Sequence, residues 1–166
     1  MSTVASGPID RLQSLMVSNV MSRRVATIPW CSSMDLAAAT LAQAAVSGAP
    51  VIDSDGRCIG VLTAADFLRF GASCDDQSNR DREWDDADGD AVAEGDSVTK
   101  YMSTVQSVTP ETPLVKAAEI MCAQHIHRLI VLNNRAVPVG IVSTLDIVAA
   151  LIGAAHEHRQ RRNKCK

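Results

Sequence analysis

The chain has 166 residues, a net charge of −3 at pH 7 and 46% hydrophobic residues, proportions typical of a soluble globular protein of one domain or two packed halves. Only 3% of the residues are aromatic, so stacking platforms for nucleic acid are largely absent, and the longest apolar run, IVAALIGAA at 147–155, is far shorter than the roughly 20 residues of a membrane span. The five cysteines contain no CxxC pair, which favours a cytoplasmic protein with reduced thiols and without a metal site.

Two similar halves make up most of the chain. Residues 17–70 align with residues 98–150, so that VSNVMS meets VTKYMS and CIGVLTAADFLRF meets PVGIVSTLDIVAA, with a constant offset of 80 from Met34 onward. Residues 71–97 between them carry ten acidic residues and two arginines without apolar periodicity, which predicts a solvated linker. We therefore expect an N-terminal extension (1–16), a first repeat (17–70), a flexible acidic linker (71–97), a second repeat (98–153) and a basic C-terminal tail (154–166).

Each half begins with a short stretch that ends in Thr27 or Val108 and runs into a proline. A segment with a period of 3.6 residues follows, and this period predicts a helix with one apolar face. The residues expected on that face are Leu36, Ala37 and Leu41 in the first half and Ala117, Ile120 and Met121 in the second.

Two short β-branched runs come next in each half. APVID and CIGVL flank the turn SDG, and LIVL and PVGIV flank the turn NNR, which predicts an antiparallel hairpin of buried strands. Helical periodicity then returns in AADFLRF (64–70) and TLDIVAALI (144–152). The sequence thus predicts an α+β fold of two tandem β-α-β-β-α repeats. Because each repeat is too small to bury both faces of its sheet, we expect the two to pack through their sheets with pseudo-two-fold symmetry.

One motif occurs at the same place in both repeats: GVLTAAD at 60–66 and GIVSTLD at 140–146. Its hydroxyl residue and its aspartate, three positions apart at the start of a helix, have the spacing of a capping box, which is a purely structural role. The same pair also suits a nucleotide, because a helix N-terminus attracts phosphate and an aspartate one turn inward can accept from both ribose hydroxyls. The motif alone leaves both interpretations open.

Together with this motif, the stretches VMSRRVATIP and HIHRLIVL resemble the CBS domain family in its paired form, the Bateman module. HIHRLIVL is similar to the corresponding stretch in the regulatory subunit of AMP-activated protein kinase. The resemblance covers nearly the whole chain and implies a sensor that binds AMP, ADP, ATP or S-adenosylmethionine in the cleft between the repeats and then modulates a partner protein. With this resemblance, the nucleotide interpretation of the motif is favoured.

The resemblance also implies roles for particular residues. The ligand-binding residues that it indicates are Thr63, Asp66, Ser143 and Asp146 for phosphate and ribose, His127 and Arg128 for the phosphates, the backbone near Val46, Ser47 and Pro50 for adenine, and Val61 and Ile141 as apolar walls. A basic pair after a helix is also compatible with simple solvation of the helix C-terminus. Because Ser47 and Gly48 occupy the places of the basic pair in the first repeat, we expect the Asp146 cleft to bind more tightly than the Asp66 cleft. Arg23 and Arg24 are an alternative source of charge for the weaker cleft.

Other functions receive less support from the sequence. No Ser-His-Asp or Cys-His spacing and no GxGxxG or GxxxxGK[ST] loop indicates an enzyme. His125 with Cys122, and His156 with His158, lack the further ligands of a metal site. The alternative to a sensor is a ligand-free CBS scaffold for dimerisation or protein interaction, and the apolar positions on the amphipathic helices predict a homodimer in either case. The basic tail is expected to be a solvated helix end, or else a segment that docks on a partner or on the acidic linker.

Overall fold

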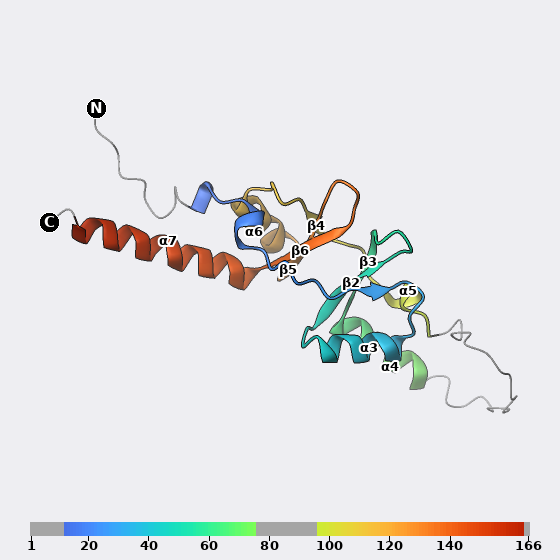
Figure 1. Ribbon diagram of the computed structural model, residues 1–166. Helices are drawn as coiled ribbons and strands as arrows, with labels where there is room; N and C mark the ends of the chain where they lie inside the picture. The colour runs from blue at the N-terminus through green and yellow to red at the C-terminus, as the bar shows by residue number, and fades with distance from the viewer. Residues whose placement is uncertain (1–11, 76–95, 165–166) are drawn as a thin grey trace, which may run out of the picture. The chain divides into compact units, whose positions relative to one another are not determined.

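The computed structural model describes residues 12–75 and 96–164, and in these ranges the two halves contain the same elements in the same order (Figure 1). The first half contains β1 (Ile28–Pro29), α3 (Met34–Gln43), β2 (Gly48–Ile52), β3 (Cys58–Thr63) and α4 (Ala64–Asp75). The second contains β4 (Ser107–Val108), α6 (Leu114–Ala123), β5 (Arg128–Leu132), β6 (Pro138–Ser143) and α7 (Thr144–Lys164). One-turn helices precede each set, α2 (Val17–Val20) and α5 (Val98–Tyr101). The predicted β-α-β-β-α order is confirmed.

Both halves form a three-stranded mixed sheet, in the orders β1-β2-β3 and β4-β5-β6. The first two strands of each sheet are parallel and are joined through α3 or α6, as a parallel connection requires. The second and third strands form the predicted antiparallel hairpin, and each hairpin has an irregularity at the same place, after Val51 and after Val131.

The chain folds into two compact units that exchange the short segments with which the repeats begin. We call residues 17–22 (VSNVMS) and 98–103 (VTKYMS) the leading segments. The β1–β3 unit comprises residues 26–105, and the β4–β6 unit comprises the chain before residue 26 together with residues 106–166. Ser22 pairs with Ile141 through two backbone hydrogen bonds of 2.9 Å, and Ser103 pairs with Val61 through bonds of 2.8 and 3.0 Å. Each leading segment therefore adds to the sheet of the other repeat.

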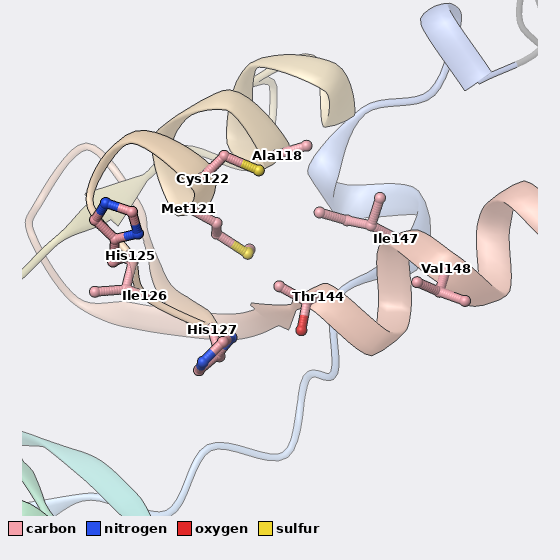
Figure 2. A pocket seen from close by; sticks show the side chains of 9 residues that line it. All are labelled: Ala118, Met121, Cys122, His125, Ile126, His127, Thr144, Ile147 and Val148. Carbon is pink, nitrogen blue, oxygen red and sulfur yellow. The ribbon is translucent and has the colours of Figure 1, made fainter.

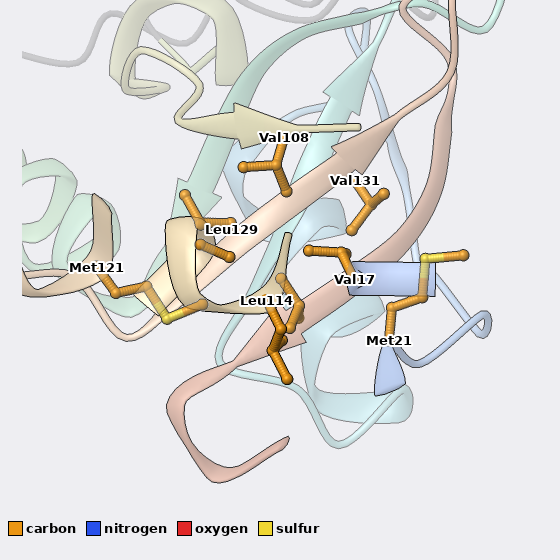
Figure 3. Packing of buried hydrophobic residues seen from close by; sticks show 9 residues of the cluster. Val17, Met21, Val108, Leu114, Met121, Leu129 and Val131 are labelled. Atoms are coloured by element: carbon orange, nitrogen blue, oxygen red, sulfur yellow. The ribbon is translucent and has the colours of Figure 1, made fainter. Parts of the chain in front are cut away.

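The leading segments also supply part of each core. Val17 and Met21 are buried in the β4–β6 unit, where Figure 3 shows them against side chains of α6, β4 and β5. The buried residues of that unit are Val17, Met21, Val108, Leu114, Ala117, Met121, Leu129, Val131 and Val142. Those of the β1–β3 unit are Ile28, Met34, Ala37, Leu41, Ala49, Val51, Leu62 and Val98.

The glycine of the repeated motif is explained by this exchange. A Cβ on Gly60 would lie 2.3 Å from Sδ of Met102, and a Cβ on Gly140 would lie 2.6 Å from Sδ of Met21. Both methionines belong to the leading segment that crosses the strand at that point. The glycines thus permit the close approach of a second segment to the sheet.

Several observed boundaries and faces differ from the expected ones. Leu36 is 58% exposed and Met34 takes its place on the buried face of α3, so the predicted face is rotated in that helix. Helix α4 continues to Asp75, five residues into the segment whose composition indicates a linker. The backbone carbonyl of Asp96, in the same segment, accepts a 2.8 Å hydrogen bond from the amide of Met34. The rest of that segment, 76–95, lies outside the described residues.

The expected terminal segments take part in the fold where they are described. Leu12 and Leu15, in the expected N-terminal extension, pack against the core of the β4–β6 unit. At the other end, α7 runs through most of the basic tail to Lys164, which makes the tail a continuation of the helix. Among the residues that the structure describes, no helix combines the length and apolar character needed to cross a membrane.

Candidate functional site

The repeated motif forms a cap at the start of α4 and at the start of α7. In α7, Oδ2 of Asp146 accepts 2.7 Å hydrogen bonds from both the amide and the hydroxyl of Ser143, and Oγ of Ser143 accepts from the amide of Asp146 at 3.3 Å. In α4, Oδ2 of Asp66 accepts from the amide and the hydroxyl of Thr63 at 2.6 and 2.7 Å. The reciprocal capping box is therefore complete at α7, and its carboxylate half is present at α4.

The second carboxylate oxygen of Asp66, Oδ1, is also occupied. This oxygen accepts a 3.0 Å hydrogen bond from the hydroxyl of Ser103 and a second hydrogen bond, within an ion pair, from Nη2 of Arg69. An ionised carboxylate offers about four lone-pair positions, and the four groups that donate to Asp66 occupy all of them. The residue is only 1% exposed. Asp66 is therefore a satisfied buried carboxylate.

Asp146 differs from Asp66 in its second oxygen. Oδ2 of Asp146 serves the cap, but Oδ1 accepts no hydrogen bond from any residue in the described part of the chain. The residue as a whole is half-buried, whereas Asp66 is 1% exposed. The two lone pairs of Oδ1 match the two hydroxyl donors of a ribose diol in number.

The β5–β6 hairpin brings the basic pair to the same end of α7. Arg128 lies opposite Ser143 in the strand register, and the carbonyl of His127 accepts a 3.1 Å hydrogen bond from the amide of Thr144. His127 and Arg128 are both exposed. Four of the predicted site residues, Ser143, Asp146, His127 and Arg128, thus gather within one unit.

The equivalent place in the β1–β3 unit carries no charge. Gly48 lies opposite Thr63, and the carbonyl of Ser47 accepts a 3.0 Å hydrogen bond from the amide of Ala64. A side chain at Gly48 would also crowd the sheet, because a Cβ there would lie 3.0 Å from the carbonyl oxygen of Leu62. The two repeats therefore share the register and the backbone hydrogen bond at this place, and only the second carries basic side chains there.

The remaining predicted site residues divide between the units. Val46 and Ser47 are exposed after α3, and buried Pro50 pairs with half-buried Val61 in the β2–β3 hairpin. Ile141 is half-buried in β6 of the other unit. The contacts of these residues with adenine stay a prediction.

A pocket that the sequence analysis did not predict lies between α6 and the first turns of α7 (Figure 2). It has a volume of about 340 Å³ and a largely apolar lining. The lining residues are Ala118, Met121, Cys122, His125, Ile126, His127, Thr144, Ile147 and Val148. Residues 144, 147 and 148 share one face of α7, whereas residue 146 is turned about 100° away from residue 147, so the pocket and the Asp146 carboxylate occupy different faces of the helix. The apolar periodicity of the two helices is the sequence signal that could have indicated this surface.

The thiols and imidazoles of the described residues form no metal site, since no group of three His, Cys, Asp or Glu side chains comes together among them. Cys122 and His125 both line the pocket without a further ligand. Cys31 and Cys122 are exposed, while burial raises the pKa of the half-buried Cys58 thiol above its usual value, partly offset by a hydrogen bond to the Gly60 carbonyl.

Comparison with known proteins places this duplicated fold in a family. The chain belongs to the CBS domain family, whose domain matches residues 17–73 and 98–153. A solved structure of the CBS domain pair of protein MJ0100, in complex with 5′-methylthioadenosine and S-adenosyl-L-methionine, has a TM-score of 0.66 and 20% identity, and the match covers 84% of this chain and 97% of that one. The CBS domain protein PAE2072 from Pyrobaculum aerophilum, complexed with AMP, also has a TM-score of 0.66, with 21% identity and coverages of 86% and 99%.

One sequence relative is a much longer protein. Homoserine O-acetyltransferase of Methanococcoides burtonii is 27% identical over 132 residues, which are 79% of this chain and 23% of that protein. The chain therefore spans about a quarter of the length of this curated relative.

Proposed function

We propose that this CBS pair is a regulatory module that binds an adenosyl ligand such as AMP through the Asp146 site. The observation that carries the proposal is the Oδ1 atom of the half-buried residue Asp146, which has no partner among the described residues. The backbone of His127 and Arg128 lies at the same end of α7. The adenosyl ligands in the similar solved structures support the same class of ligand.

Each residue of the site then has a defined task. Oδ1 of Asp146 accepts from the two ribose hydroxyls. Ser143 holds the carboxylate in place, because its hydroxyl already donates its hydrogen to Oδ2. His127 and Arg128 neutralise the phosphates, for which the arginine can supply two parallel hydrogen bonds. In this proposal adenine contacts the backbone near Val46, Ser47 and Pro50, and Val61 and Ile141 form its apolar walls.

The output of the module is the modulation of a partner protein. In this proposal the module is a homodimer, does no catalysis and acts in the cytoplasm. Ligand binding changes its affinity for the regulated partner, since a ligand can shift an equilibrium only through different affinities for its two states.

Calorimetric titration with AMP tests the Asp146 site. Asp146→Ala removes the ribose acceptor and is expected to weaken AMP binding roughly ten- to a hundredfold, because a hydrogen bond to a charged group contributes about 1.5–3 kcal/mol and each factor of ten corresponds to about 1.4 kcal/mol. Asp55→Ala is the matched control: it removes an exposed carboxylate of the same charge from a turn and should leave the affinity unchanged. Equal affinity of wild type and Asp146→Ala would contradict the proposal.

A ligand-free scaffold is the second candidate function. The observation in its favour is that both motif carboxylates act as helix caps, and Asp66 is fully occupied in that role. Thermal unfolding with AMP, ADP, ATP or S-adenosylmethionine separates the two functions. A ligand at a hundred times its dissociation constant stabilises the folded state by about 2.7 kcal/mol, whereas a scaffold with empty sites shows no shift with any of the four.

A further inference from the structure

The two motif aspartates have different neighbours three residues further along their helices. With the constant offset of 80, Arg69 of α4 corresponds to Ala149 of α7, and Asp66 corresponds to Asp146. The rest of the motif is chemically alike, since Thr63 and Ser143 each donate their hydroxyl hydrogen to Oδ2 of the motif aspartate. Arg69 and the Ser103 hydroxyl, which both donate to Oδ1 of Asp66, therefore separate an occupied carboxylate from a half-open one.

The Arg69 guanidinium is held over Asp66 by several contacts. Its Nη2 pairs with Oδ1 of Asp66 and lies within 3.3 Å of the carbonyl of Tyr101 and 3.1 Å of the hydroxyl of Ser103. Tyr101 ends α5, and Ser103 pairs with β3, so both acceptors come from the exchanged leading segment. The Arg69 side chain is itself 62% exposed, so it covers the buried carboxylate from the solvent side.

We infer that Arg69 acts as an internal occupant of the Asp66 carboxylate, so that each chain binds one adenosyl ligand, at Asp146, rather than two. The inference rests on the proposed function and assigns its stoichiometry to Arg69, which covers Asp66 together with the Ser103 hydroxyl. A ribose diol at Asp66 would compete with a tethered cation and with the Ser103 hydroxyl for acceptor positions that are all taken. Ala149 has no donor with which to cover Asp146.

The test exchanges the residues at positions 69 and 149 and measures the number of AMP molecules bound per chain. In calorimetry, wild type is expected to bind one AMP per chain, and Arg69→Ala, which places the second repeat's residue in the first, is expected to bind a second, weaker AMP. Adding Asp66→Ala to Arg69→Ala should return the count to one. Arg57→Ala is the matched control, since it also removes an exposed arginine from an ion pair and should keep one site.

The reciprocal variant, Ala149→Arg, is expected to cover Asp146 and to weaken AMP binding at least tenfold. Circular dichroism and thermal unfolding of every variant establish that it is folded before the count is made. A wild-type count of two, a count of one for folded Arg69→Ala, or unchanged affinity for Ala149→Arg would overturn the inference while the proposed function stands. Absence of AMP binding by wild type and by Arg69→Ala would contradict the proposed function and the inference together.

Discussion

At the scale of single residues, Asp66 and Asp146 show how one motif acquires two different environments. Both cap a helix, but Asp66 also accepts from Ser103 and Arg69 and is 1% exposed. A buried carboxylate that accepts from four donors contributes to folding stability, because its removal leaves those donors without their acceptor. Asp146 keeps one oxygen outside the cap.

The two aspartates should therefore differ in their contribution to stability without ligand. Asp66→Ala is expected to lower the free energy of unfolding by about 1–3 kcal/mol, because buried donors lose their partner while the exposed Arg69 regains water. Asp146→Ala loses only the cap, a change of about 1 kcal/mol. Urea denaturation of both variants measures the difference. An equal or larger loss for Asp146→Ala would show that its surroundings are as saturated as those of Asp66.

At the scale of elements, α7 presents a solvent-exposed row of apolar side chains. Leu145, Val148 and Ile152 are 77, 49 and 51% exposed, and Leu151 is 44% exposed. Their spacing of three and four residues places them along one side of the helix. This row is the part of α7 that the proposed homodimer would bury.

A charge in this row is expected to prevent self-association. Val148→Glu should convert a dimer into a monomer at micromolar concentration, because an unpaired carboxylate in an apolar interface keeps its cost of desolvation. Sedimentation equilibrium measures the change. The control is Gly153→Glu, which places the same charge on the same helix where a side chain meets no atom within 4 Å, away from the row. Wild type that is monomeric at every concentration, or a Val148→Glu dimer, would count against this interface.

At the scale of the whole molecule, each compact unit depends on the segment that begins the other sequence repeat. Val17 is 0% exposed in the core of the β4–β6 unit, and Val98 is 0% exposed in the core of the β1–β3 unit. The two sequence repeats therefore cannot be separated by one cut in the linker without removing a core residue from each.

Core substitutions in the leading segments should act on the distant repeat. Val17→Ala is expected to lower the stability of the β4–β6 unit by on the order of 2 kcal/mol, through lost burial and the cavity that remains. Native-state hydrogen exchange should then show weaker protection in β5 and β6 than in β2 and β3. Val98→Ala is the mirror experiment and should weaken β2 and β3. The reverse pattern, with each variant weakening its own repeat, would contradict the exchange of segments.

The sequence by itself determined which elements form and in what order. Hydrophobic periodicity, the turns SDG and NNR, and the duplicated motif depend on interactions within a few residues, so the two β-α-β-β-α halves and the caps at Thr63 and Ser143 could be predicted. The gathering of His127 and Arg128 beside Ser143 likewise follows from the register of a tight hairpin.

Only the tertiary structure decided how segments far apart in the sequence combine. VSNVMS and VTKYMS have the same local pattern, so nothing local indicates that each leaves its own repeat and packs against the other sheet. The saturation of Asp66 depends on Ser103, 37 residues away, and on the place where Arg69 finds its acceptors. Acceptor capacity is a property of everything within hydrogen-bond distance, and a repeat alignment, which compares residues position by position, assigned the two aspartates the same role.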